Sequence, residues 1–266
     1  MNGIMADPYV YEGTNVLKNK FDIRDVKALL KKEFEIVAFE LYLLQFSPLE
    51  GNYDLDHLCK MHKQIFGGLY EWAGQVRNMN ILKRESFLKN DSIEYEKWPN
   101  IKKSATKILD SMKTVPWKAL VQEQLISEIV SHYAQLWKVH PFREGNTRTI
   151  TNFIIQYMEE QEIFFSRLYF VESIPNLRKA LSYASLYYDG LNKSILLKPL
   201  QHIIKTSMER HEQEMERYLS LNKDGKLSWT DYYNMIWLEK SNEISSQGNN
   251  KISKAITAKD EVRFEK

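Results

Sequence analysis

The sequence predicts an all-α fold. Leu, Ile, Lys and Glu dominate its long segments, and these residues favour helices. Gly and Pro are scarce, at 10 and 7 of 266 residues, so a fold of many short strands and tight turns is disfavoured. Apolar residues recur at steps of three and four, as on one side of a helix. The mass of 31.5 kDa suits one large domain, or one domain with an appendage.

The first helix is expected to begin near Asp22 or Asp25, where apolar residues start to recur with helical spacing. Pro48 and Gly51 are expected to interrupt it. Its predicted buried face consists of Val26, Leu30, Phe34, Val37, Leu41 and Leu44.

Further helices follow from the same spacing and from Pro and Gly signals. They are expected from about 54 to 66, 101 to 112, 125 to 136 and 150 to 158, and after Pro175 and Pro199. The segment 69–89 lacks a helical period, which predicts a short hairpin or loop. The sequence SLNKDGKLSWTD at 220–231 has the spacing of a degenerate EF-hand, but a turn between two helices explains it more simply.

The charge balance points to neither nucleic acid nor a membrane surface. The net charge is +2, from 37 basic and 35 acidic residues. No stretch of about 20 apolar residues predicts a membrane span, and the N-terminus lacks the features of a signal peptide. The single Cys59 excludes an intramolecular disulfide. We therefore expect a protein of the bacterial cytoplasm, with export as an effector left open.

The segment most suggestive of chemistry is HPFREGNTR, from His140 to Arg148. It lies between two predicted amphipathic helices, so it forms a loop that opens onto a helix N-terminus, where backbone N–H groups and the helix dipole attract anions. Gly145 lets the backbone approach a ligand closely, and Asn146 adds an amide donor. Arg148 can direct two N–H groups at a phosphate.

Two further residues of this segment suit a reaction at phosphorus. Glu144 offers a carboxylate for Mg²⁺, which in proteins is held by one or two carboxylates and by phosphate oxygens. A neutral His140 can accept the proton of an attacking hydroxyl as a general base. The combination predicts attack of a hydroxyl on a phosphate.

HPFREGNTR resembles the signature of the Fic family, HPFx(D/E)GN(G/K)R. The segment YVYEGTNVLKNK, at 9–20, resembles the start of that family's domain. HKQIFGGLYEWAGQVRNMNI, at 62–81, resembles its helix with a WAGxxR exit. The resemblance extends over roughly residues 9 to 205.

This resemblance implies an all-α, Fic-type helical bundle with a short β-hairpin flap beside the active site. It also implies a protein adenylyltransferase that moves AMP from ATP to a Tyr, Thr or Ser hydroxyl of a target protein, and possible self-modification. Glu144 followed by Gly145 and Asn146 favours transfer of AMP over transfer of phosphate. The implied organisation is a lead-in at 1–21, the Fic domain at 22–205, a helical extension at 206–240 and a flexible tail at 241–266.

The resemblance also assigns the site residues. His140 is the expected catalytic base and Glu144 the expected Mg²⁺ ligand. The expected ATP-binding residues are Arg143, Gly145, Asn146, Thr147 and Arg148. The flap is expected to hold the target by strand addition through Lys83, Arg84 and Phe87.

Two residues depart from the common family pattern. Thr147 replaces a small Gly, and Thr151 stands where many members have a second Arg that holds the γ-phosphate.

The inhibitory pattern of the family, (S/T)xxxE(G/N), is matched only with Asp for Glu, at 185–190 and 220–225, or one residue short, at 47–51. We therefore expect control by a separate, antitoxin-like inhibitor or no such control. The alternatives are removal of AMP, transfer of another phosphoryl or nucleotidyl group, and a catalytically weak interaction module.

Overall fold

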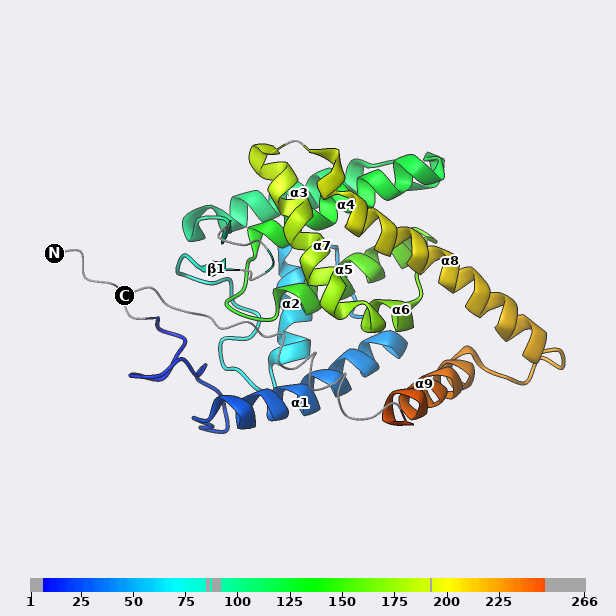
Figure 1. The fold of residues 1–266 in the computed structure, drawn as a ribbon, viewed down its shortest axis with the longest axis horizontal. Helices are drawn as coiled ribbons and strands as arrows, with labels where there is room; N and C mark the ends of the chain where they lie inside the picture. The colour runs from blue at the N-terminus through cyan, green and yellow to red at the C-terminus, as the bar shows by residue number, and fades with distance from the viewer. Residues whose placement is uncertain (1–6, 85–86, 88–91, 192, 247–266) are drawn as a thin grey trace. The chain divides into compact units, whose positions relative to one another are not determined.

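A computed structural model describes residues 7–84, 87, 92–191 and 193–246. Within them the helices are α1 (Val26–Phe46), α2 (Leu55–Phe66), α3 (Ile101–Thr114), α4 (Gln122–Val139), α5 (Asn146–Glu160), α6 (Arg167–Glu172), α7 (Ile174–Leu186), α8 (Lys198–Leu221) and α9 (Trp229–Ser246). The strands are β1 (Leu82–Arg84) and β2 (Ser92–Glu94), and short helical turns lie at Trp98–Asn100, Trp117–Ala119, Tyr187–Leu191 and Ser194–Leu196. The predicted all-α class is confirmed (Figure 1).

The described chain forms two compact units. One consists of residues 7–115 and 132–157, and the other of 116–131 and 158–246. The boundaries fall within α4 and α5, so each of these helices contributes to both units. The motif segment 140–148 belongs entirely to the first unit. The proposed division at residues 22, 206 and 241 stays a prediction.

The first unit is built around α2, which packs against α1 and α3. Two aspartates define where its first helices begin. The Asp25 carboxylate accepts the Ala28 N–H at 2.8 Å, and the Asp54 carboxylate accepts the His57 N–H at 2.8 Å. Each satisfies a backbone donor that has no partner inside the helix. These caps confirm the predicted starts of both helices.

The buried face of α1 differs from the predicted one. It consists of Leu29, Glu33, Val37 and Leu44, whereas Phe34 is 59% exposed and Val26 is also exposed. The reason is Glu33, which the apolar pattern treats as a surface residue. Its carboxylate pairs with Arg148 and Tyr70 inside the first unit. Val37 and Leu44 are buried as predicted, and the buried face also includes Glu33.

The segment after α2 contains the predicted hairpin. β1 and β2 pair antiparallel, with Leu82 opposite Glu94 and Arg84 opposite Ser92. Residues 85–86 and 88–91, which join the two strands, lie outside the described residues. The hairpin is the only sheet within the described part of the chain.

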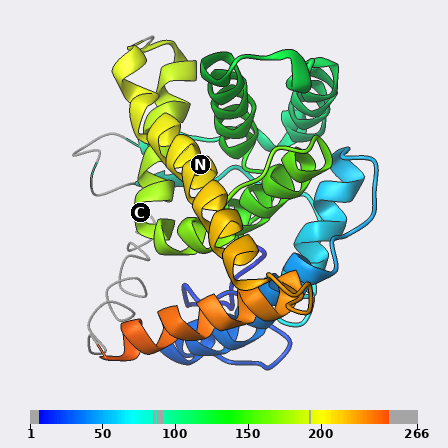
Figure 2. The ribbon, with the colours of Figure 1, turned by 90° about the vertical axis from the view of Figure 1, so that its right-hand side faces the viewer.

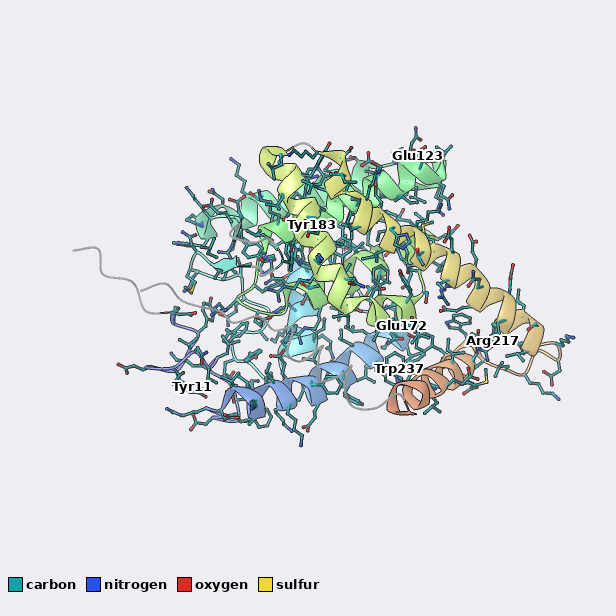
Figure 3. All side chains as sticks on the ribbon, in the orientation of Figure 1. Tyr11, Glu123, Glu172, Tyr183, Arg217 and Trp237 are labelled. Atoms are coloured by element: carbon teal, nitrogen blue, oxygen red, sulfur yellow. The ribbon has the colours of Figure 1, made fainter. Side chains whose placement is uncertain are left out.

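The second unit contains α6 to α9, in which α7 and α6 both pack against α8 (Figure 2). Helices were predicted after Pro175 and Pro199, and α7 and α8 are found there, each beginning one residue before its proline. Figure 3 labels Arg217 near the C-terminal end of α8, where its guanidinium bonds the Glu239 carboxylate of α9 at 3.1 Å. No described helix is both long and apolar enough to cross a bilayer.

The connection from α8 to α9 is a turn between two helices, as the simpler interpretation predicted. The side-chain amide oxygen of Asn222 accepts the Leu227 N–H at 2.8 Å, and the Asp224 carboxylate accepts the Lys226 N–H at 3.2 Å. Ser228 then accepts the Asp231 N–H at 3.0 Å and so caps α9. The polar side chains of this segment are used by its own backbone.

Candidate active site

The motif loop joins α4 to α5 through two residues with a left-handed backbone. His140 has φ 50° and Gly145 has φ 82°. Asn146 closes the loop between them, because its side-chain oxygen accepts the Phe142 N–H at 2.9 Å and its NH₂ group donates to the Phe142 carbonyl at 2.7 Å. The Thr149 N–H then donates to the Gly145 carbonyl and begins α5. The loop therefore presents the N-terminal turn of α5, which is a favourable place for an anion.

Gly145 is required by its surroundings as well as by its backbone. A Cβ at this position would lie 2.4 Å from the Phe66 ring of α2. The same ring supports the guanidinium of Arg148, 4.7 Å from the ring centroid. A side chain at residue 145 would therefore disturb both the loop and the arginine that follows it.

Replacing Gly145 by alanine is expected to lower the free energy of unfolding by roughly 2–4 kcal/mol, because left-handed strain and overpacking against Phe66 add together. The matched control is Gly225→Ala, where φ is 70° and no atom lies within 4 Å of the added Cβ. This control should cost only the strain, about 1 kcal/mol. Urea unfolding of both variants measures the difference. Equal costs would show that Phe66 does not constrain residue 145.

The ring of His140 is buried and held in one orientation. Tyr95 stacks on it, with centroids 3.7 Å apart and planes 21° apart, and Trp137 meets it edge-on at 5.2 Å. The His140 Nδ1 lies 3.1 Å from the Trp137 carbonyl oxygen. A carbonyl can only accept, so Nδ1 carries the proton and Nε2 is the basic nitrogen of the neutral ring. This is the tautomer that a general base needs.

A second histidine supports the loop from α2. The ring of His62 lies parallel to that of buried Phe142, with centroids 3.9 Å apart. Its Nδ1 accepts the Gly74 N–H at 2.8 Å, and its Nε2 donates to the Glu144 carbonyl at 3.0 Å. Burial lowers the pKa of His62 to about 4, so the ring is neutral near pH 7 and keeps this donor and acceptor pattern.

Arg148 lies between two carboxylates and an aromatic ring. Its Nη1 is 2.8 Å from the Glu33 carboxylate and its Nη2 is 3.8 Å from that of Glu144. The Tyr70 hydroxyl donates to the other oxygen of Glu33 at 2.6 Å. Burial opposes the charge of Arg148, but Glu33 and Glu144 outweigh it and raise its pKa. A quarter of the Arg148 side chain stays exposed, and Glu33 pairs with one of its two terminal nitrogens.

Arg143 is used differently from what the resemblance implies. Its Nε and Nη2 donate to one carboxylate oxygen of Asp7, at 3.0 and 2.7 Å. Both side chains are buried. These contacts assign Arg143 to holding the loop against the N-terminal segment, and they give no support to its predicted role as an ATP ligand.

The two threonines that depart from the family pattern are bonded within the helices. The Thr147 hydroxyl accepts the Trp137 Nε1–H at 2.9 Å. The Thr151 hydroxyl donates to the Thr147 carbonyl at 2.6 Å and contacts the Tyr133 hydroxyl at 2.5 Å. Thr151 is buried, so the position of the usual second arginine is occupied by a short, internally bonded side chain.

The predicted flap residues lie on the hairpin. Lys83 and Arg84 belong to β1, where their backbones are paired with those of Ile93 and Ser92 in the antiparallel register. Phe87 follows the strand and is half-buried. The structure therefore places the three residues on one segment that follows the WAGxxR exit.

Glu144 suits a magnesium ion that is bound mainly by a nucleotide. Its carboxylate accepts the Gly145 N–H at 3.0 Å and is partly exposed beside Arg148. The described residues contain no group of three His, Cys, Asp or Glu side chains that could hold a metal alone. A single carboxylate at the end of an anion site fits Mg²⁺, which keeps waters and phosphate oxygens as its other ligands.

Comparison with known proteins decides the family. The profile described as the Fic/DOC family matches residues 52–158. The probable protein adenylyltransferase y4lH of Sinorhizobium fredii is 31% identical over 147 residues, which cover 54% of this chain and 71% of that protein. The chain belongs to the Fic/DOC family.

Two other relatives show how far the likeness extends. The protein adenylyltransferase VbhT of Bartonella schoenbuchensis is 32% identical over 155 residues, or 58% of this chain and 31% of that protein. The alignment thus spans about a third of VbhT. The structure of BepC, a VirB-translocated effector protein of Bartonella tribocorum, has a TM-score of 0.62 at 20% identity, and the match covers 75% of this chain and 95% of that one. The Fic-type fold is therefore confirmed.

Several residues of the Fic/DOC site were not found from the sequence. Glu33 lies in the charged run KKEFE, where it is indistinguishable from a surface residue. Tyr95 follows β2 without any motif of its own, and Asp7 precedes the first segment of the family resemblance. His62 was not singled out either, although its contacts with Gly74 and Glu144 hold the loop in place. Only the likeness of residues 62–81 to the family could have directed attention to it.

Proposed function

We propose that this chain is a protein adenylyltransferase, which transfers AMP from ATP to a hydroxyl of a target protein. The observation that carries the proposal is the His140 ring. Its Nδ1 proton is directed at the Trp137 carbonyl, which makes Nε2 the base, and the residue lies six positions before α5, whose N-terminal turn is the proposed anion site. Relatives named as protein adenylyltransferases support the same reaction.

In the proposed reaction, the target hydroxyl oxygen attacks the α-phosphorus of ATP. A new oxygen–phosphorus bond forms, the bond from the α-phosphorus to the bridging oxygen breaks, and pyrophosphate leaves. His140 Nε2 accepts the hydroxyl proton as this happens. The N-terminal turn of α5, with Asn146 and Thr147, and the preceding Gly145 would hold the phosphates through backbone N–H groups. The Gly145 N–H would exchange the Glu144 carboxylate, which accepts it in this structure, for a phosphate oxygen.

Arg148 and Glu144 complete the proposed nucleotide site. Arg148 would bind the β- or γ-phosphate through N–H groups that Glu33 does not use, while Glu33 holds its Nη1. Mg²⁺, held by Glu144 and phosphate oxygens, would neutralise part of the phosphate charge. Lys83, Arg84 and Phe87 would hold the target segment by strand addition to the hairpin. A separate inhibitor protein stays a prediction.

Incubation with ATP labelled at either phosphate tests the proposal. With a cell lysate as the source of target, we expect label in protein from α-labelled ATP, none from γ-labelled ATP, and none after Mg²⁺ is chelated. Label from the γ-position alone would identify a kinase. Label from neither position, together with loss of AMP from a premodified protein, would identify the reverse activity. Label from neither without such loss would favour an interaction module.

A further inference from the structure

Arg77 is a buried cation that binds backbone carbonyls from three parts of the first unit. Its Nε donates to the His140 carbonyl at 2.8 Å and its Nη1 to the Met79 carbonyl at 2.5 Å. Its Nη2 donates to the carbonyls of Glu96 at 2.5 Å and Val139 at 3.3 Å. The side chain is 1% exposed. Burial lowers the pKa of Arg77 to about 10, which leaves it charged near pH 7.

One of these bonds restrains an unfavourable backbone conformation. A left-handed φ costs a residue other than glycine roughly 1–2 kcal/mol, and it persists only where the surroundings enforce it. At His140 two hydrogen bonds from Arg77 restrain the backbone. The Arg77 side chain holds its carbonyl, and the Arg77 backbone N–H donates to the carbonyl of the next residue, Pro141, at 2.9 Å.

The other bonds fix the two ends of the hairpin. Met79 precedes β1 and Glu96 follows β2, so one guanidinium holds the chain where it enters and where it leaves the flap. Tyr95, which stacks on the His140 ring, is the neighbour of Glu96. Arg77 therefore holds the His140 backbone directly. It also positions the Tyr95 ring, which stacks on the His140 ring, by binding the carbonyl of the next residue, Glu96.

We propose that Arg77 is a positioning residue, which holds His140 in its base-competent tautomer and couples the target-binding hairpin to it. For its effect on rate this rests on the proposed function, whereas its effect on the His140 ring does not. Lysine cannot replace it, because an ammonium is a point charge and cannot direct donors at four carbonyls spread around a planar group.

The test uses ¹⁵N-histidine NMR on the full chain and its variants Arg77→Lys and Arg77→Gln. The matched control is Arg24→Gln, which alters an exposed arginine of the same unit. The His140 signals are assigned by their absence in His140→Asn. We expect a protonated Nδ1 in the wild type and in the control. Both Arg77 variants should show a mixture shifted toward the Nε2–H tautomer, because the Nδ1 bond to Trp137 depends on the restrained backbone.

Transfer of AMP from α-labelled ATP supplies the second measurement. The Arg77 variants should lose about 100-fold in kcat, because small displacements of a catalytic group have effects of this order, and change far less in KM for ATP. Folded Arg77 variants with the wild-type tautomer would overturn the proposal, whether or not AMP transfer is found. If the variants do not fold, the wild type decides: the Arg77 Nε–H must exchange slowly with solvent, and rapid exchange would overturn the proposal.

Discussion

Replacing His140 by alanine is expected to lower the rate of AMP transfer by about 10²–10⁴-fold, the usual contribution of a general base. The structure gives the reason, since the ring is oriented by Tyr95, Trp137 and the Trp137 carbonyl so that Nε2 is basic. Binding of ATP should change little, because the α5 turn and Arg148 remain. Transfer from α-labelled ATP and calorimetric titration with ATP measure the two effects.

The control for this variant is His202→Ala, at an exposed histidine of α8. It should transfer AMP at the wild-type rate. Unchanged transfer by a folded His140→Ala variant would remove the proposed base. A loss of ATP affinity as large as the loss of rate would instead show that the variant had disturbed the anion site.

Replacing Glu33 by alanine is expected to destabilise the chain by roughly 2–4 kcal/mol, because it leaves a largely buried guanidinium and a buried hydroxyl without their acceptor. Breaking a fully buried ion pair costs about 3–5 kcal/mol. The expected cost is somewhat smaller here, because the Arg148 side chain is 25% exposed and Glu144 also lies near it. Glu33→Gln should cost less, because its amide oxygen can still accept from Arg148. Urea unfolding at neutral pH measures both.

Glu35→Ala is the matched control on the same helix. Its carboxylate is exposed and pairs with Lys32 at 3.4 Å, so its loss should stay within about 0.5 kcal/mol. The double variant Glu33→Ala/Arg148→Ala should be more stable than the sum of its single variants predicts, since it leaves no unpaired charge. Additive costs in this cycle would mean that the pair does not stabilise the fold.

The local features of this protein could be predicted from its sequence. Asp25 and Asp54 mark helix starts because a cap is a contact between residues three apart. The loop and helix start at the motif from His140 to Arg148 could also be predicted, because the contacts that form them join residues only four apart. The hairpin was predicted as one of two alternatives, since a short segment without helical period could equally have been a loop.

The pairing of charges could not be predicted in this way. Arg143 and Arg148 both suggest phosphate binding by their residue type, yet the structure gives Arg143 to Asp7. The buried face of α1 was only partly predicted, with Val37 and Leu44 correct, because a glutamate within a charged run carries no sign that it is buried. Such partners are chosen when distant segments pack together, and the apolar period of one helix contains no information about them.

The ion pair between Asp7 and Arg143 has a consequence for how small a working fragment can be. The family profile begins at residue 52, whereas Asp7 and Glu33 lie before it. A fragment cut at that boundary would keep both arginines of the motif and discard the acids that neutralise them. Arg143 would lose its Asp7 partner, and Arg148 would keep only the more distant Glu144 carboxylate, at 3.8 Å. The two arginines of the motif therefore keep all their acidic partners only together with the first 33 residues of the chain.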